Sequence, residues 1–344
     1  MKRKLIYLLL GTTLSLAING QTGGDNIYEF LNLTYSGLAA SLGGTNVSIN
    51  TDKLNMSWHN PGLLNNGMDK SLSLNYSNYY AGINYGMAMY SASFERTGNF
   101  AAGITYLNYG SFTEADPSGN ITGSFSASEY AFPVIYSRSF DTLFTVGVTV
   151  KPVLSFLEKY SSFGMAFDLG ASWHNPSGLF SAGIVMRNAG IEITRYAGEA
   201  RQKLPFEIEA GVSQKLEHAP FRFSLTLRHL EKYDLTYDYN DTTAVETNEF
   251  QSSEFLENMM RHVVAGVELI PHKNFYISAG YNYQRRRELQ IETKAAAVGF
   301  SWGFGLNTSW FNLEFGRATY HLAGSSNHVS FIIRPGQLYT RNRK

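Results

Sequence analysis

The chain has 344 residues, with 28 lysines and arginines against 28 aspartates and glutamates, so its formal net charge is zero. This balance gives no indication of nucleic acid or an anionic surface as a partner. The absence of cysteine excludes disulfides, thiolate metal sites and cysteine nucleophiles. Aromatic residues make up 14% of the chain and there are 32 glycines, a combination that favours strands.

The first twenty residues carry an export signal. A basic stretch at positions 2–4 precedes an apolar run over 5–18, and small residues lead to Gly20. This order predicts a cleaved signal peptide over 1–20. A membrane anchor is the alternative, but the apolar run is shorter than the roughly 20 residues that a spanning helix needs.

Residues 21–70 have a mixed composition that does not suit a barrel wall. An apolar stretch over 27–33 is followed by small residues over 37–44 and then by Asn60 and Pro61. A barrel with many strands has inner space that its own side chains do not fill. We therefore predict that 21–70 is an N-terminal hatch, or plug, inside a barrel. The alternative is a periplasmic leader that merely precedes the wall.

Alternation of apolar and polar residues recurs from 71 to 335, as the wall of a transmembrane barrel requires. Polar positions such as Asp168, Arg222 and Arg228 suit a wet lumen. The pattern predicts an all-β fold, a transmembrane antiparallel β-barrel over 71–335 with a C-terminal tail over 336–344. The fourteen predicted strands are 71–79, 84–94, 98–109, 128–140, 143–153, 164–174, 179–188, 204–215, 221–231, 262–270, 274–283, 295–304, 307–317 and 327–334.

The connections between these strands alternate in length. Tight turns, one of them at Gly305 and Leu306, alternate with long stretches at 110–127, 189–203, 232–261 and 284–294. Bacterial barrels have short periplasmic turns and longer extracellular loops, so we expect an outer-membrane location with both termini periplasmic. A soluble β-sandwich is the alternative, but its strands are shorter than the roughly ten residues predicted for these.

Two blocks of sequence carry a family resemblance. The first contains Tyr28, Phe30 and Leu31, then Gly43 and Gly44, then Asn60 and Pro61. The second covers 261–268 and 280–289. Together they resemble the PorQ family, an outer-membrane component of the type IX secretion system.

The resemblance implies a protein of the attachment complex that anchors secreted cargo on the cell surface. It implies a barrel in outer-membrane lipid that holds a PorZ-like surface protein beside a PorU-like sortase and a PorV-like barrel. The family is similar to the fatty-acid-transporter (FadL-like) class of fourteen-stranded barrels with an N-terminal hatch. It supplies no catalytic residues, and we expect no cofactor and no metal.

Two charged groups are candidates for partner contacts. The long loop from Asp234 to Glu257 carries seven acidic residues and no basic one, among them Asp238 and Asp241. This loop is either a docking site or an ordinary solvated loop. The cluster Arg285, Arg286 and Arg287 is either a contact for lipopolysaccharide phosphates or a solvated strand end.

Enzyme motifs are not evident. The eight histidines are scattered, and neither an H-E-x-x-H zinc motif nor a G-x-S-x-G elbow occurs. Three hypotheses follow, in falling order: an attachment-complex barrel, a transporter for hydrophobic small molecules and a barrel hydrolase. The first predicts surface partners and a lumen closed by the hatch, and the second predicts an apolar pocket near the hatch.

Overall fold

The computed structural model describes residues 26–79, 82–140, 142–197, 200–235, 251–289, 297–321 and 324–336, without the side chains of 251–254 and 321. The signal peptide predicted over 1–20 and nearly all of the tail predicted over 336–344 lie outside these residues.

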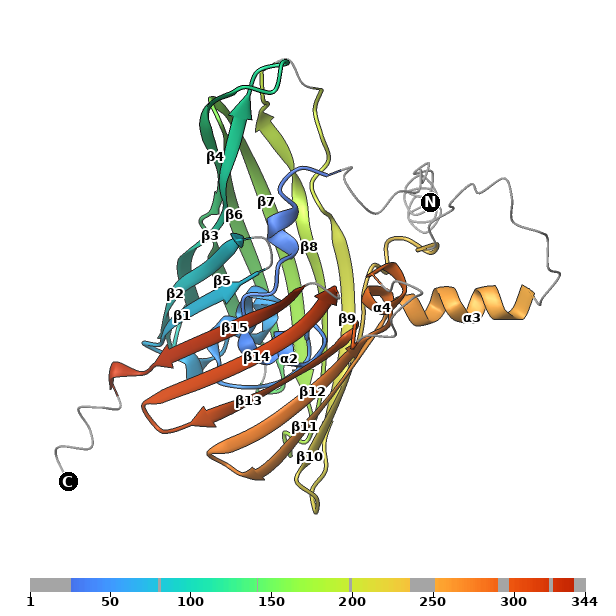
Figure 1. Ribbon diagram of the computed structural model, residues 1–344. Helices are drawn as coiled ribbons and strands as arrows, with labels where there is room; N and C mark the ends of the chain where they lie inside the picture. Colours follow the sequence, from blue (N-terminus) through green and yellow to red (C-terminus); the bar gives the residue numbers. More distant parts are fainter. Residues whose placement is uncertain are drawn as a thin grey trace, which may run out of the picture.

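Strands dominate the described chain and form one antiparallel sheet that closes on itself, since β1 pairs with the last strand, β15 (Figure 1). The predicted all-β barrel is therefore confirmed. The strands are β1 (Leu72–Asn78), β2 (Asn84–Phe94), β3 (Gly98–Ala115), β4 (Ile121–Ala131), β5 (Val134–Ser139), β6 (Phe144–Leu157), β7 (Tyr160–His174), β8 (Phe180–Thr194), β9 (Glu207–Lys215), β10 (Phe221–Leu227), β11 (Val263–His272), β12 (Phe275–Asn282), β13 (Phe300–Asn307), β14 (Phe311–His321) and β15 (Gly324–Ile333).

The segments β4 and β5 together form one strand of the wall. Both pair with β3 in a single register, in which Ala131 lies opposite Thr105 and Val134 lies opposite Ala102. The interruption falls at Pro133, which has no N–H to donate to the ladder. With these two segments merged, the wall has the fourteen strands that the sequence predicts.

Side chains alternate between the two faces of the wall. On β6, Thr149 and Lys151 are buried inside, whereas Phe144 and Val148 on the other parity are exposed outside. The inward polar groups are paired, as in the ion pair between Lys151 Nζ and Asp168 Oδ1 at 2.7 Å. An apolar outer face and a paired polar inner face are what a barrel in lipid requires.

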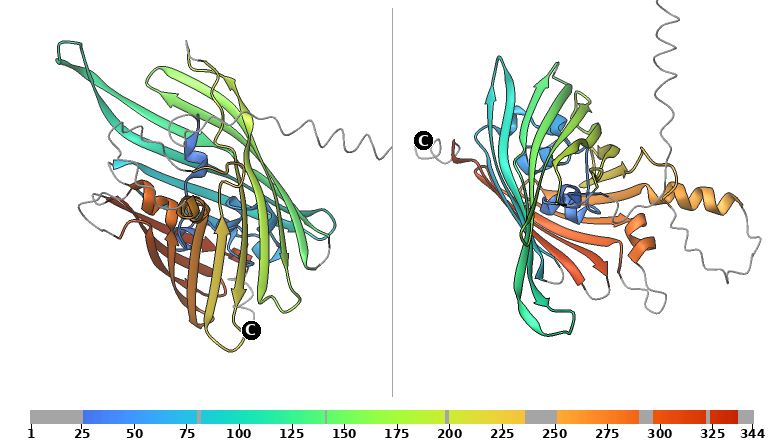
Figure 2. Two further views of the ribbon diagram at one scale, coloured as in Figure 1. Left: turned by 90° about the vertical axis from the view of Figure 1, so that its right-hand side faces the viewer. Right: turned by 90° about the horizontal axis from the view of Figure 1, so that it is seen from above.

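The N-terminal segment, residues 26–71, lies inside the ring of strands when the molecule is seen from above (Figure 2). Every residue from Thr34 to Ile49 and from Lys53 to Leu64 is buried. Five short helices divide this segment: η1 (Glu29–Asn32), α2 (Gly37–Ser41), η2 (Leu54–Trp58), η3 (Pro61–Leu63) and η4 (Asn66–Met68).

Two of the stretches predicted as loops contain helices, α3 (Gln251–Arg261) and α4 (Tyr283–Leu289). None of the helices among the described residues is long and apolar enough to cross a membrane. The stretch 110–127 is also not a plain loop, because β3 and β4 continue into it as a hairpin. The register of this hairpin shifts at a bulge near Gly110, and Phe112 stacks on Phe125 with ring centroids 5.2 Å apart.

The turn predicted at Gly305 and Leu306 is wrong, because both residues lie within β13. The chain turns three residues later, where the Thr308 hydroxyl accepts a hydrogen bond from Phe311 N at 3.0 Å. Asn307 and Thr308 are better turn formers than a glycine flanked by strand residues, and the alternation of burial runs unbroken through Gly305.

The two ends of the described chain lie at opposite ends of the barrel. Ile27 N donates to Lys203 O at 2.9 Å, in the long connection between β8 and β9. At the other end of the chain, β15 stops at Ile333, on the side of the short turns. The loop lengths predict both termini on the turn side, whereas the described chain begins at the loop side and runs through the lumen to β1.

Candidate functional site: two pockets beside the N-terminal segment

Glu314 of β14 fixes the N-terminal segment in the lumen. Its carboxylate pairs with Lys53 Nζ at 2.8 Å and accepts hydrogen bonds from Asn55 Nδ2 at 2.9 Å and Leu38 N at 3.2 Å. Leu38 lies in the first turn of α2, where a negative charge is favourable. One wall carboxylate therefore holds three separate points of the segment.

Glycines of the wall let α2 approach β12, β13 and β14 closely. A Cβ on Gly280 would lie 2.2 Å from the carbonyl carbon of Leu42, and one on Gly303 would lie 2.6 Å from Ser41 Cβ. Ser41 Oγ is also hydrogen bonded to Ser278 Oγ at 2.6 Å. The contact therefore depends on small residues on the wall.

Three of the residues that carry the family resemblance lie at the loop end of the segment. Tyr28, Phe30 and Leu31 are buried, with exposed fractions of 2% or less. The Tyr28 hydroxyl is hydrogen bonded to Ser162 Oγ, and the Leu31 carbonyl accepts from Arg187 Nη2 at 3.1 Å. Burial raises the pKa of Tyr28 to about 12. These residues tie the beginning of the segment to β7 and β8.

Two further resemblance positions, Gly43 and Gly44, have left-handed backbones with φ of 104° and 109°. A Cβ on Gly43 would lie 2.4 Å from Val264 Cγ1, and one on Gly44 would lie 2.5 Å from Arg285 Nη2. Only glycine combines this backbone with such close neighbours. The fold thus brings together Gly44 from the first block of the resemblance and Arg285 from the second.

Asn60 and Pro61 form a tight corner against β7. Asn60 Oδ1 accepts from Gly62 N at 2.8 Å, and its Nδ2 donates to Val47 O at 2.8 Å and to Ala171 O at 3.1 Å. Pro61 occupies the first position of η3, where its missing N–H costs nothing. The Asn-Pro pair therefore positions the chain structurally.

The arginine cluster lies on α4 and not at a strand end. The Arg285 guanidinium stacks over the Tyr320 ring at 4.1 Å, and Arg287 Nη2 contacts Glu257 Oε1 of α3 at 2.6 Å. Burial raises the pKa of Glu257, but Arg287 and Arg261 outweigh burial and hold that pKa below its usual range. Arg285 and Arg287 of the cluster therefore both have partners within the chain.

The predicted acidic loop is described only in part. Asp234 lies within the described residues, whereas Asp238 and Asp241 lie outside them. The contacts proposed for this loop and for lipopolysaccharide therefore stay predictions.

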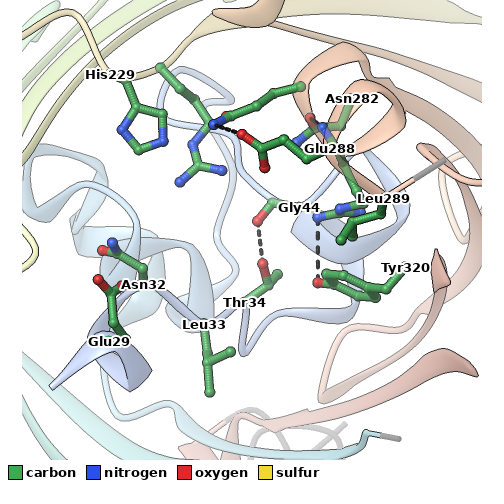
Figure 3. A pocket seen from close by; sticks show the side chains of 13 residues that line it. Glu29, Asn32, Leu33, Thr34, Gly44, His229, Asn282, Glu288, Leu289 and Tyr320 are labelled. Carbon is green, nitrogen blue, oxygen red and sulfur yellow. Dashed lines mark hydrogen bonds between the residues drawn. The ribbon is translucent and has the colours of Figure 1, made fainter. Parts of the chain in front are cut away.

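A polar pocket of about 360 Å³ opens at the loop end of the lumen (Figure 3). The N-terminal segment contributes Glu29, Asn32 and Thr34, and α4 contributes Arg285 and Glu288 on the other side. Arg285 Nη1 is buried and has no hydrogen-bond partner among the described residues. The pocket therefore offers one unsatisfied donor beside carboxylates, which suits a polar occupant.

His229 lines the same pocket and should make stability depend on pH. Burial lowers its pKa and Arg228 opposes protonation, but Glu207 and Glu231, at 3.6 and 3.3 Å, raise the pKa above its usual range. Protonated His229 then adds stability that is present below about pH 6.5 and lost as pH rises through the folded-state pKa.

Thermal unfolding in detergent, from about pH 5 to about pH 9, should show this loss of stability. The His229→Gln variant should lack this dependence of stability on pH. Identical profiles for both proteins would contradict it.

A second pocket, of about 280 Å³, lies between β3, β4 and β6 at the loop end. Its walls are mainly apolar and include Phe112, Ala127 and Leu157. Tyr109 and Tyr196 also line it, and both pack against the apolar cluster that contains Ile27, Tyr28, Phe30 and Leu31 of the N-terminal segment.

One carboxylate lies at the base of this apolar pocket. Glu129 accepts hydrogen bonds from Tyr109 Oη at 2.7 Å and from Ser155 Oγ at 3.0 Å. Mainly apolar walls with a few convergent polar groups are typical of small-molecule sites. No group of three or more His, Asp or Glu side chains within the described ranges is arranged to hold a metal ion.

Solved structures share this fold. The Pseudomonas putida toluene transporter TodX is 11% identical with a TM-score of 0.52, covering 87% of this chain and 96% of its own. A deltaS2 mutant of the TodX monoaromatic hydrocarbon channel is 13% identical with a TM-score of 0.52, covering 88% and 98%. A Pseudomonas aeruginosa FadL homologue is 10% identical with a TM-score of 0.48, covering 91% and 100%.

At these identities the likeness establishes the fold alone. The protein has the same β-barrel fold as the TodX channel structures. No protein-family model and no curated protein matches the chain. The comparisons thus support the wider barrel class that the sequence resembles, and they give no support to the PorQ family in particular.

Proposed function

We propose that the protein is an outer-membrane channel or transporter for small hydrophobic molecules. The observation that carries this proposal is the apolar pocket lined by Phe112, Ala127 and Leu157, which lies beside the N-terminal segment at the loop end. A pocket in this place is what the transporter hypothesis predicts. The TodX proteins that share the fold are described as a toluene transporter and a monoaromatic hydrocarbon channel, which supports the same ligand class here.

Filling the apolar pocket should strongly reduce uptake. Ala127 is buried at the pocket wall, whereas its neighbour Ser126 points outward and is exposed. Ala127→Trp should reduce toluene uptake by cells that express the protein by about tenfold or more, because an indole occupies the space that the ligand needs. Ser126→Trp is the matched control and should leave uptake unchanged.

Radiolabelled toluene supplied to cells with and without the protein gives the measurement. Wild-type uptake no greater than that of cells without the protein would overturn the proposal. Equal loss in both tryptophan variants would show that the apolar pocket is not the route.

Attachment of secreted proteins is the second candidate. It is favoured by the complete burial of Thr34–Ile49 and Lys53–Leu64, since a barrel filled in this way suits a membrane mount. Under this proposal the acidic loop beginning at Asp234 and the Arg285–Arg287 cluster are the surfaces for a PorZ-like partner and lipopolysaccharide. Affinity purification from outer membranes should then recover a sortase and a surface protein in stoichiometric amounts, and recovery of the barrel alone would count against it.

A further inference from the structure

The helix α3 presents its apolar side chains away from the protein. Phe255, Leu256 and Met259 are 54%, 60% and 50% exposed. Leu256 and Met259 follow Phe255 by one and four residues, a spacing that places all three on one face of the helix. Three large apolar side chains therefore form a continuous exposed strip.

The opposite, polar face of α3 is the one that packs on the protein. Asn258 is buried and its Oδ1 accepts a hydrogen bond from Leu235 N at 3.0 Å, while Arg261 Nη1 donates to Leu235 O at 3.3 Å. Glu257 pairs with Arg287 of α4. A helix on the surface of a water-soluble protein has the reverse arrangement, with its apolar stripe toward the core.

Chain connectivity places α3 at the rim of the barrel. Its last residue, Arg261, is separated from the first residue of β11, Val263, by a single residue. Figure 1 and the right-hand view of Figure 2 show α3 projecting outward from the side of the barrel formed by β9, β10 and β11. The helix therefore lies outside the wall, over the space that lipid occupies.

On this side the rim lies at the boundary of the membrane hydrocarbon. β10 has seven residues, which span roughly 23 Å at about 3.3 Å per residue. A barrel strand needs about 9–11 tilted residues to cross the bilayer, so β10 does not extend beyond it. By contrast, β3 has 18 residues and rises well past the rim.

The apolar strip continues the lipid-facing surface of the wall. On β10, Phe223 and Leu225 are 49% and 41% exposed. Leu230 and Tyr233, in the connection that follows, are also exposed. We infer that α3 lies in the outer-leaflet interface of the membrane and that its apolar face binds lipid. Amphipathic helices in membrane interfaces bury their apolar face in this way.

Site-specific labelling tests the inference, because the chain has no cysteine to remove. Leu256→Cys carries a bimane fluorophore, and the full chain is reconstituted in phosphatidylcholine vesicles that contain 5-doxyl phosphatidylcholine. Phe223→Cys on the outer wall and Ser118→Cys in the exposed β3–β4 turn are the reference positions. Interfacial burial should make doxyl lipid quench the Leu256 label at least about twofold, as at Phe223, with little quenching at Ser118.

Two outcomes would overturn the inference. Quenching of the Leu256 label by aqueous iodide, as strong as at Ser118 and without doxyl quenching, would mean that α3 is solvated. Protection from both quenchers would mean that protein covers the apolar face. Met259→Cys reports on the same face and should repeat the Leu256 result, so a local effect of one label does not decide the test.

Discussion

Replacing Glu314 with alanine should release the N-terminal segment and lower the free energy of unfolding by about 3–5 kcal/mol. The reason is that Lys53 would remain buried without its counter-charge, and Asn55 and Leu38 N would lose their acceptor. Thermal unfolding in detergent gives the loss of stability. Limited proteolysis of the folded barrel shows whether the segment has become accessible.

A double substitution separates the charge from the packing. Lys53→Met together with Glu314→Met removes both buried charges and keeps comparable volumes, so it should recover a large part of the lost stability. If Glu314→Ala unfolds like the wild type, or if the double variant is less stable than the single one, the ion pair does not hold the segment.

Gly280→Val should displace α2 from the wall and open the lumen to ions. A Cβ at this position would lie 2.2 Å from the Leu42 carbonyl carbon and 2.3 Å from Gly43 N, and backbone atoms cannot rotate away as a side chain can. The outer face of the wall remains unchanged, so the barrel should still fold. The single-channel conductance in planar bilayers should rise above the wild-type level by about tenfold or more, as expected when a lumen loses its occupant.

Ala279→Val is the matched control, since Ala279 is the neighbouring residue and points outward to lipid. Its conductance should equal that of the wild type. Unchanged conductance in Gly280→Val, with the barrel folded, would mean that the lumen stays closed without the close packing of α2 against β12.

Much of the wall was predictable because lipid imposes a strict period of two on every strand. The predicted strand 84–94 coincides with β2, and the inward assignment of Asp168, Arg222 and Arg228 agrees with their ion pairs. The count of fourteen strands also follows from this alternation, although Pro133 interrupts one of the strands. These features depend on local alternation, which a single sequence displays directly.

The site was less predictable, because it depends on contacts between distant parts of the chain. Gly44 and Arg285 both stand out in the sequence, but nothing local indicates that they touch. The extension of the β3–β4 hairpin and the helices α3 and α4 were not predicted from the sequence, for a different reason. Beyond the membrane the period of two is no longer imposed, and polar strand ends then resemble loops.

The placement of the N-terminal segment sets an order of events during biogenesis. The segment fills the interior, and β1 follows it directly and pairs with the final strand, so that Leu72 lies opposite Ile333. Polypeptide chains do not ordinarily thread through closed loops. The sheet must therefore curl around the segment while the seam between β1 and β15 is still open. Glu314 lies on β14, beside the seam strand β15, and pairs with Lys53 of the segment. A segment that precedes β1 in the chain therefore acts as the internal template for strands that follow it.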